Sequence, residues 1–191
     1  LKHKAMFSDF TLNLSKGREE YHNDETEDWN VTFVETGAET NTGGRVKKIE
    51  KYIQDEHFFM TYGDGVADID IKALLQHHLS KGKIATLTSI QPMSRFGILE
   101  FDNNHIVTSF KEKPKLEGWI NAGFFVFKKD IFNFLDGNPV LEQEPLITLA
   151  KENQLVAYPH NGLWGCMDTH RDFEELNKLW SSGRAFWKVW E

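Results

Sequence analysis

Hydrophobic and polar residues alternate in two short segments near the start of the chain. Phe10, Leu12 and Leu14 occupy every second position, and residues 29–34 read Trp-Asn-Val-Thr-Phe-Val. Alternation of this kind predicts half-buried strands. The polar, acidic segment 17–28 between them predicts a loop. The first region is therefore expected to be strand, loop and strand.

The pattern then changes to a helical period, and strands alternate with helices. Apolar residues share one face of a helix that opens near Gly43. Residues 58–62 predict a strand, after which Asp70 can cap a helix that Gly82 ends, before a strand over 84–88. A strand, a helix and a strand in this order predict two parallel strands joined by a right-handed crossover.

Strand patterns continue through the rest of the chain. Segments 97–101 and 106–110 flank Asp-Asn-Asn-His, which predicts a hairpin. Further strands are expected at 119–127 and 155–158, and helices at 130–135, 145–151 and 171–180. Together these elements predict an α/β fold with a Rossmann-like mixed, mainly parallel sheet flanked by helices, in a single domain over residues 1–191.

Composition and charge limit the classes of partner. The 191 residues are 40% hydrophobic, enough for one domain with a substantial core. A formal net charge of −7 argues against a broad basic face for nucleic acid, so an anionic ligand needs local cations. The single cysteine, Cys166, excludes an intramolecular disulfide, and no segment is long and apolar enough to span a bilayer. We expect a cytoplasmic protein that binds neither membrane nor nucleic acid.

Two carboxylates follow predicted strands. Asp64 stands between two glycines directly after the strand over 58–62, where ligands bind in open α/β sheets. A simple Asp-Gly turn is the alternative. Asp168 lies in a loop before the last helix and can reach the same end of the sheet, although taken alone it would be a helix cap. Two carboxylates completed by water and phosphate oxygens suit Mg²⁺.

Three more segments carry polar groups beside predicted elements. The threonine- and glycine-rich segment 36–42 offers either backbone N–H groups to an anion or an ordinary helix cap. Residues 110–114, Phe-Lys-Glu-Lys-Pro, project charges past a strand end, as solvated edges also do. Asn121, between small and apolar neighbours, is either a reader of sugar hydroxyls or part of a bulge.

Seven segments together resemble the motifs of the sugar-1-phosphate nucleotidyltransferases, in that family's order and over nearly the whole chain. They are Thr36-Gly37, Thr42-Gly43-Gly44-Arg45, Tyr62-Gly63-Asp64-Gly65-Val66-Ala67-Asp68, Glu112-Lys113-Pro114, Asn121-Ala122-Gly123-Phe124-Phe125, Glu142-Gln143-Glu144-Pro145-Leu146 and Met167-Asp168-Thr169-His170-Arg171-Asp172. Thymidylyl members usually have Gly-Asp-Asn where this chain has Gly-Asp-Gly, which favours the cytidylyl branch. The resemblance implies a GT-A-like fold and a Mg²⁺-dependent reaction of CTP with α-D-glucose 1-phosphate that yields CDP-glucose and pyrophosphate.

The resemblance also implies roles for individual residues. Two of them, Asp64 and Asp168, would be catalytic carboxylates that hold Mg²⁺. The residues implied to bind CTP are Thr36, Arg45 and Gly63. The residues implied to line the glucose 1-phosphate site are Tyr62, Glu112, Lys113, Asn121 and Gly123. Ala122 stands where the family commonly has a second glycine, a difference that would narrow the sugar pocket.

The family begins with a strand and a loop of the type Gly-Gly-x-Gly-Thr-Arg, followed by a Lys-Pro segment, and neither has a counterpart in this sequence. That loop cradles the triphosphate in the family. The resemblance therefore implies a domain truncated at its N-terminus relative to the family, and we expect the 191-residue chain by itself to be weakly active or inactive. It further implies a homo-oligomer that serves nucleotide-sugar biosynthesis for the lipopolysaccharide O-antigen.

Other functions compete with this one. A GT-A glycosyltransferase would use Asp68-Ile69-Asp70 as an Asp-x-Asp metal motif, although Asp70 is also the predicted helix cap. The non-enzymatic alternative is a fragment that binds sugar phosphate or serves in assembly. A zinc site made of Cys166, Asp168 and His170 has little support, because a loop with this spacing supplies no further ligand.

Two remaining features are expected to be structural. His77-His78 lies on a predicted helix, with one residue at the surface and one half-buried. Four aromatic residues near the C-terminus favour packing or a subunit contact, since no basic groove accompanies them. They are Trp180, Phe186, Trp187 and Trp190.

Overall fold

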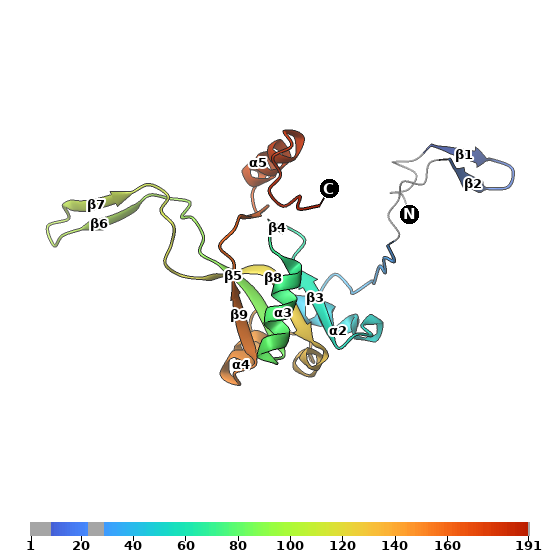
Figure 1. Cartoon of the computed structure of the whole chain (residues 1–191), viewed down its shortest axis with the longest axis horizontal. Coiled ribbons are helices and arrows are strands. Elements are labelled where there is room, and N and C mark those ends of the chain that lie inside the picture. Colours follow the sequence, from blue (N-terminus) through green and yellow to red (C-terminus); the bar gives the residue numbers. More distant parts are fainter. Residues whose placement is uncertain (1–8, 23–28, 191) are drawn as a thin grey trace. The chain divides into compact units, whose positions relative to one another are not determined.

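The computed structural model describes residues 9–22 and 29–190, which divide into two units (Figure 1). The first unit, Leu1–Glu35, contains a hairpin of β1 (Phe10–Asn13) and β2 (Arg18–Tyr21). β1 confirms the first predicted strand, whereas β2 lies where a loop was expected; residues 23–28 of that loop are outside the described residues. The strand predicted over 29–34 is wrong, because no described segment supplies its backbone with a pairing partner.

The second unit, Thr36–Glu191, is built on a four-stranded mixed sheet. In spatial order its strands are β3 (His57–Thr61), β8 (Ile120–Lys128), β5 (Ala85–Ile90) and β9 (Leu155–Pro159). β8 runs antiparallel to β3 and to β5, while β5 and β9 pair in parallel. Three strands therefore point the same way, as the predicted crossover requires. Because β8 separates β3 from β5, however, the expected mainly parallel sheet has only one parallel hydrogen-bonded pair among its described strands.

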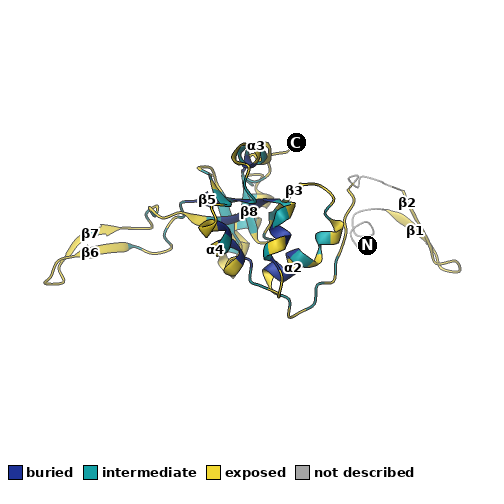
Figure 2. Ribbon diagram, turned by 90° about the horizontal axis from the view of Figure 1, so that it is seen from below, coloured by how far each residue is buried: buried dark blue, intermediate teal, exposed yellow. Residues whose placement is uncertain are grey.

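Helices cover both faces of this sheet (Figure 2). The helices described in this unit are α2 (Thr42–Lys48), η1 (Glu50–Tyr52), α3 (Ile71–Lys81), η2 (Lys129–Phe134) and α4 (Glu144–Lys151), together with α5 (His170–Ser181), which has no buried residue and contributes nothing to the core of the sheet. On one face Leu74 of α3 packs with Ile69 against Val126 of β8. On the other, α2, η2 and α4 enclose a core around Phe125 and Phe127. Side chains alternate across a strand, so β8, buried on both faces, divides the apolar core into two layers.

The local signals for α3 are confirmed in detail. The Asp70 side chain accepts a hydrogen bond from the Ala73 N–H at 2.9 Å, and Gly82 ends the helix with a left-handed φ of 58°. The predicted hairpin is formed by β6 (Ile98–Phe101) and β7 (Val107–Lys111), which project away from the sheet of their unit (Figure 1). No described helix combines the length and the apolar character that a membrane span requires.

Candidate functional site

A small two-stranded ribbon brings together the segments that carry the two predicted carboxylates. It pairs β4 (Gly65–Ala67) with β10 (Trp164–Cys166) in antiparallel fashion. Just beyond the ribbon, the Met167 N–H donates to the Asp64 carbonyl oxygen at 2.8 Å. Asp64 and Asp168 therefore flank neighbouring strand ends just past β3. The sequence did not predict either strand, because three residues are too few for an alternating pattern.

Asp168 lies in a polar cluster. Arg95 Nη2 is 3.4 Å from Asp168 Oδ2 and 3.4 Å from Asp172 Oδ2, and the Cys166 thiol donates to Asp168 Oδ2 at 3.1 Å. Burial, followed by this hydrogen bond to Asp168, raises the pKa of the Cys166 thiol to about 11. The thiol is therefore protonated at neutral pH, which makes it a donor and a poor nucleophile.

The interpretation of Asp168 as a helix cap is wrong. Thr169 caps α5, since its hydroxyl accepts from the Asp172 N–H while the Asp172 carboxylate accepts from the Thr169 N–H. This capping box satisfies the start of the helix without Asp168. The Asp168 carboxylate is left exposed, with the Cys166 thiol and Arg95 as its partners.

The two carboxylates fit Mg²⁺ in the type of ligand they offer. The Asp64 carboxylate is exposed, and within the described residues it makes neither a hydrogen bond nor an ion pair. Carboxylate oxygens are hard ligands, and Mg²⁺ usually keeps several waters beside one or two of them. In the described part of the chain, no group of three or more His, Cys, Asp or Glu side chains could hold a metal ion, so the alternative zinc site at Cys166, Asp168 and His170 is not formed.

The Asp-x-Asp alternative is also not supported. Asp70 serves as the N-cap of α3. Asp68 Oδ1 accepts from the Leu163 N–H at 2.8 Å and lies 2.8 Å from His160 Nε2. Both carboxylates therefore stabilise local structure through hydrogen bonds.

Three residues predicted for the sugar-phosphate site meet at the end of β3. The Tyr62 N–H donates to the Gly123 carbonyl oxygen at 3.0 Å, and the Tyr62 hydroxyl accepts from Asn121 Nδ2 at 3.1 Å. Asn121 Oδ1 accepts from the Gly123 N–H at 2.9 Å. The Tyr62 hydroxyl itself donates to Glu142 Oε1. Burial, then the Glu142 hydrogen bond, raises the pKa of Tyr62 above its ordinary value, so the phenol keeps its proton.

Glu142 was not predicted as a site residue, although it stands in one of the motifs quoted above. The signal that could have found it is a carboxylate next to the predicted start of a helix, but its partner Tyr62 lies 80 positions away in the sequence.

Glu112 and Lys113, also predicted for the sugar-phosphate site, lie elsewhere. Both are exposed and follow β7 at the base of the hairpin, where Lys113 has a φ of 44°. Within residues 9–22 and 29–190, neither residue has a hydrogen bond or ion pair that joins it to Tyr62 or Asn121.

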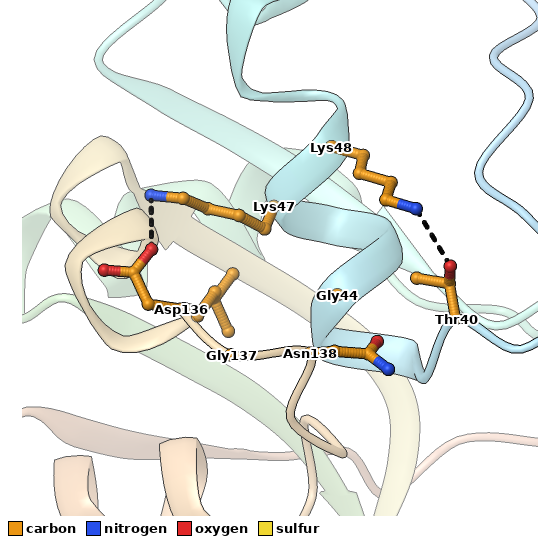
Figure 3. A pocket seen from close by; sticks show the side chains of 8 residues that line it. Thr40, Gly44, Lys47, Lys48, Asp136, Gly137 and Asn138 are labelled. Atoms are coloured by element: carbon orange, nitrogen blue, oxygen red, sulfur yellow. Dashed lines mark hydrogen bonds and ion pairs between the residues drawn. The ribbon is translucent and has the colours of Figure 1, made fainter.

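Two of the predicted nucleotide-binding residues are in contact. Arg45 Nη1 donates to Thr36 Oγ1 at 2.6 Å, and Lys48 Nζ donates to the Thr36 carbonyl oxygen at 2.5 Å. Lys48 Nζ also donates to Thr40 Oγ1 at 3.0 Å (Figure 3). Gly63, the third predicted residue, lies at the turn with Asp64, and among the described residues it takes no part in this cluster of hydrogen bonds.

The start of α2 is packed against another segment, which disfavours the prediction of an open anion site there. The Gly44 N–H donates to the Pro139 carbonyl oxygen at 3.3 Å. A Cβ on Gly44 would fall 2.2 Å from Asn138 Oδ1, and one on Gly43 would fall 2.8 Å from the Pro139 oxygen. The two glycines are thus required by the close approach of the chain at Asn138 and Pro139.

Cavities adjoin each of these clusters. One of about 310 Å³ lies beside α2, where Lys47 Nζ is 3.2 Å from Asp136 Oδ1 (Figure 3). One of about 390 Å³ opens at Asn121. A third, of about 250 Å³, has Asp64 in its wall together with Trp180 and Trp187. The rings of these two tryptophans stack with centroids 6.5 Å apart, so part of the C-terminal aromatic group packs together beside Asp64.

The histidine pair is more deeply buried than predicted. His78 is completely buried, with Nε2 3.0 Å from His57 Nδ1 and Nδ1 2.8 Å from Thr86 Oγ1. Burial, followed by the charges of His57 and His77, lowers the pKa of His78 to about 4. His78 is therefore a neutral imidazole that joins α3 to the sheet through its contacts with His57 of β3 and Thr86 of β5.

A protein-family model described as Nucleotidyl transferase matches residues 11–181, most of the chain. The chain belongs to the nucleotidyl transferase family. This nucleotidyl transferase is 48% identical over 187 residues to proteins named glucose-1-phosphate cytidylyltransferase from Salmonella typhi and from Salmonella typhimurium. Each alignment covers 96% of this chain and 72% of the relative. The family predicted from the motifs is confirmed.

The structure of HddC from Yersinia pseudotuberculosis has the same fold as this nucleotidyl transferase. The two superpose with a TM-score of 0.55 at 22% identity, over 74% of this chain and 63% of that chain. The predicted α/β fold, a mixed sheet flanked by helices, is confirmed. The chain spans less than two thirds of the HddC structure.

Proposed function

We propose that this chain carries the activity of a glucose-1-phosphate cytidylyltransferase, which joins CTP and glucose 1-phosphate to form CDP-glucose and pyrophosphate. The observation that carries the proposal is that one turn, Tyr62-Gly63-Asp64, joins the carboxylate ribbon to the hydrogen-bond cluster at Asn121 and Gly123. The named relatives from Salmonella, 48% identical to this chain, support the choice of nucleotide and sugar.

The proposed reaction needs no nucleophile from the protein. A phosphate oxygen of glucose 1-phosphate attacks the α-phosphorus of CTP, and the bond from that phosphorus to the oxygen bridging to the β-phosphate breaks. Pyrophosphate leaves with this oxygen. The protein contributes position and charge, the usual form of catalysis in such transfers. The protonated Cys166 thiol agrees with a mechanism that has no covalent enzyme intermediate.

Asp64 and Asp168 are the residues we assign to Mg²⁺. When bound, the ion would offset negative charge on the phosphates. The remaining assignments follow the clusters described above. The nucleotide would be held by Thr36 and Arg45, with Gly63 at the turn. The residues proposed to hold the sugar phosphate are Tyr62, Asn121, Gly123, Glu112 and Lys113. The last two would act from the base of the hairpin.

A homo-oligomer in the cytoplasm, supplying CDP-glucose for lipopolysaccharide O-antigen, completes the proposal. The β6–β7 hairpin supports assembly, because apolar side chains on both of its strands are exposed, among them Phe101 at 61% and Phe110 at 62%.

Pyrophosphate release tests the proposal. The chain is incubated with Mg²⁺, glucose 1-phosphate and either CTP, UTP or dTTP, and binding of CDP-glucose is measured by calorimetry alongside. We expect selective release with CTP, abolished by Asp64→Asn and by Asp168→Asn. Asp55→Asn, at an exposed carboxylate in the loop before β3, is the matched control and should behave as the unchanged chain.

Three other outcomes would point elsewhere. Binding of CDP-glucose without release from any nucleotide would favour a non-catalytic sugar-phosphate-binding fragment. Equal release from all three nucleotides would contradict the assignment to CTP. Release that survives both aspartate substitutions would contradict the proposed metal ligands.

A further inference from the structure

Glu142 receives a hydroxyl donor on each of its two carboxylate oxygens. Thr42 Oγ1 donates to Glu142 Oε2 at 2.9 Å, and the Tyr62 hydroxyl donates to Oε1. Glu142 lies two residues before α4, Thr42 is the first residue of α2, and Tyr62 follows β3. One carboxylate thus connects three segments that are far apart in the sequence.

The direction of both hydrogen bonds is fixed by neighbouring donors. Thr42 Oγ1 accepts from the Leu141 N–H at 2.9 Å, so its own proton is free to point to Glu142. The Tyr62 oxygen accepts from Asn121 Nδ2 at 3.1 Å, which likewise directs the phenol proton to Glu142. Hydrogen bonds to an ionised acceptor are roughly twice as strong as neutral ones. The arrangement is therefore a directed network anchored on one negative charge.

The network ends on residues that the proposed function uses. Asn121 Oδ1 accepts from the Gly123 N–H, so the amide has a single orientation that leaves Nδ2 to Tyr62. On one side, Tyr62 directly precedes the turn of Gly63 and Asp64. On the other side, Thr42 lies three residues before Arg45, within one turn of the same helix.

We propose that Glu142 is a positioning residue of the active site. It acts through Tyr62 and Asn121, without touching the substrate, and holds the turn that carries Asp64 against the helix that carries Arg45. The inference rests on the proposed function, because it gives Glu142 the task of fixing the metal-binding turn relative to the nucleotide-binding helix. Small misplacements of such groups lower rate and affinity strongly.

A set of variants separates this role from simple stabilisation. Glu142→Ala removes both acceptors, Glu142→Gln keeps the shape and removes the charge, and Tyr62→Phe removes only the hydroxyl group. Glu144→Gln is the matched control, since this exposed carboxylate lies two positions along the chain and outside the network. For each folded variant, calorimetry in the presence of Mg²⁺ gives the dissociation constants of CDP-glucose and glucose 1-phosphate.

We expect Glu142→Ala and Tyr62→Phe each to weaken CDP-glucose binding by about tenfold, the loss that follows when a charged hydrogen bond is removed. The double variant should bind no more weakly than the weaker single variant, because both changes break the same connection. Glu142→Gln should lie between Glu142→Ala and the unchanged chain, and it serves in place of Glu142→Ala if that variant does not fold. Ultraviolet titration of the tyrosines should show the pKa of Tyr62 falling in Glu142→Gln.

Distinct results would overturn distinct claims. If the unchanged chain binds neither CDP-glucose nor glucose 1-phosphate, the proposed function fails and the inference fails with it. If the unchanged chain binds CDP-glucose and Glu142→Ala binds it equally well, the inference alone is wrong. Losses that multiply in the double variant would show that Glu142 does not act through Tyr62.

Discussion

Replacing Gly123 by alanine should destabilise the protein by two separable effects. Gly123 has a φ of +80°, and a Cβ built there would lie 2.5 Å from Cδ2 of the Tyr62 ring. A side chain at positive φ costs roughly 1–2 kcal/mol. A contact of 2.5 Å is well inside the carbon–carbon optimum of about 3.5–4.0 Å, so the ring must move.

The cost of moving the ring can be estimated from the structure. Overpacking of this kind costs roughly 1–3 kcal/mol in a well-packed site. The two effects together predict a loss of about 2–5 kcal/mol in the free energy of unfolding. Displacement of the ring would also stretch the hydrogen bond that Tyr62 accepts from Asn121 and the one it donates to Glu142, so ligand binding should fall together with stability.

Two other glycines provide matched controls for urea unfolding followed by circular dichroism. Gly82 has a φ of +58° and nothing within 4 Å of a Cβ, so Gly82→Ala should show only the backbone cost of roughly 1–2 kcal/mol. Gly118 has neither a positive φ nor a close neighbour, so Gly118→Ala should change stability little. A Gly123→Ala midpoint no lower than that of Gly82→Ala would refute the steric argument.

Further predictions concern the buried histidine, the last helix and the core. The pKa of His78 is lowered to about 4 in the folded protein, so between that pH and about 6.5 the unfolded chain binds the extra proton and stability should fall on acidification, by about 3 kcal/mol in all. The free energy of unfolding, measured with urea at several pH values, checks this. In His78→Gln the free energy of unfolding should fall less steeply on acidification, whereas in His77→Gln it should fall as in the unchanged chain. The same pH dependence in the unchanged chain and in both variants would contradict the prediction. Thr169→Ala removes the cap of α5 and should lower the free energy of unfolding by about 1 kcal/mol; an unchanged melting temperature would show that the capping box contributes nothing. Leu74→Ala in the core beneath α3 should cost about 2–5 kcal/mol in urea unfolding, whereas Leu79→Ala on the half-exposed side of the same helix should cost far less, and similar losses would contradict the packing described.

Local signals in the sequence predicted the elements that depend on local chemistry. Asp70 and Gly82 delimit α3 because a cap and a left-handed glycine act within one turn of the helix. The strand predicted over 29–34 failed because a strand also needs a partner, and the alternating pattern says nothing about whether one is present. β4 and β10 were missed for the opposite reason, since pairing between distant segments makes strands of residues whose own pattern is too short.

The distinction between local signals and contacts made by distant segments applies to the candidate site as well. Motif order identified Asp64, Asp168, Tyr62 and Asn121 one by one, and the structure places them in two clusters joined by a turn. Nothing local to Glu142 indicates that it receives the Tyr62 hydroxyl, because that contact depends on how the loop before α4 meets the residue that follows β3. The alternative of Asp168 as a helix cap failed because Thr169, the next residue, forms a complete capping box with Asp172.

The central place of β8 has a consequence for synthesis of the chain on the ribosome. β3 and β5 emerge first, but neither can find its sheet partner until residues 120–128 have been made. In the interval the nascent chain holds two unpaired strands, and unpaired strand edges favour association between chains. The β6–β7 hairpin, which pairs only with itself, can form during that interval. The sheet therefore closes late, when a strand from the second half of the chain enters between two that were made before it.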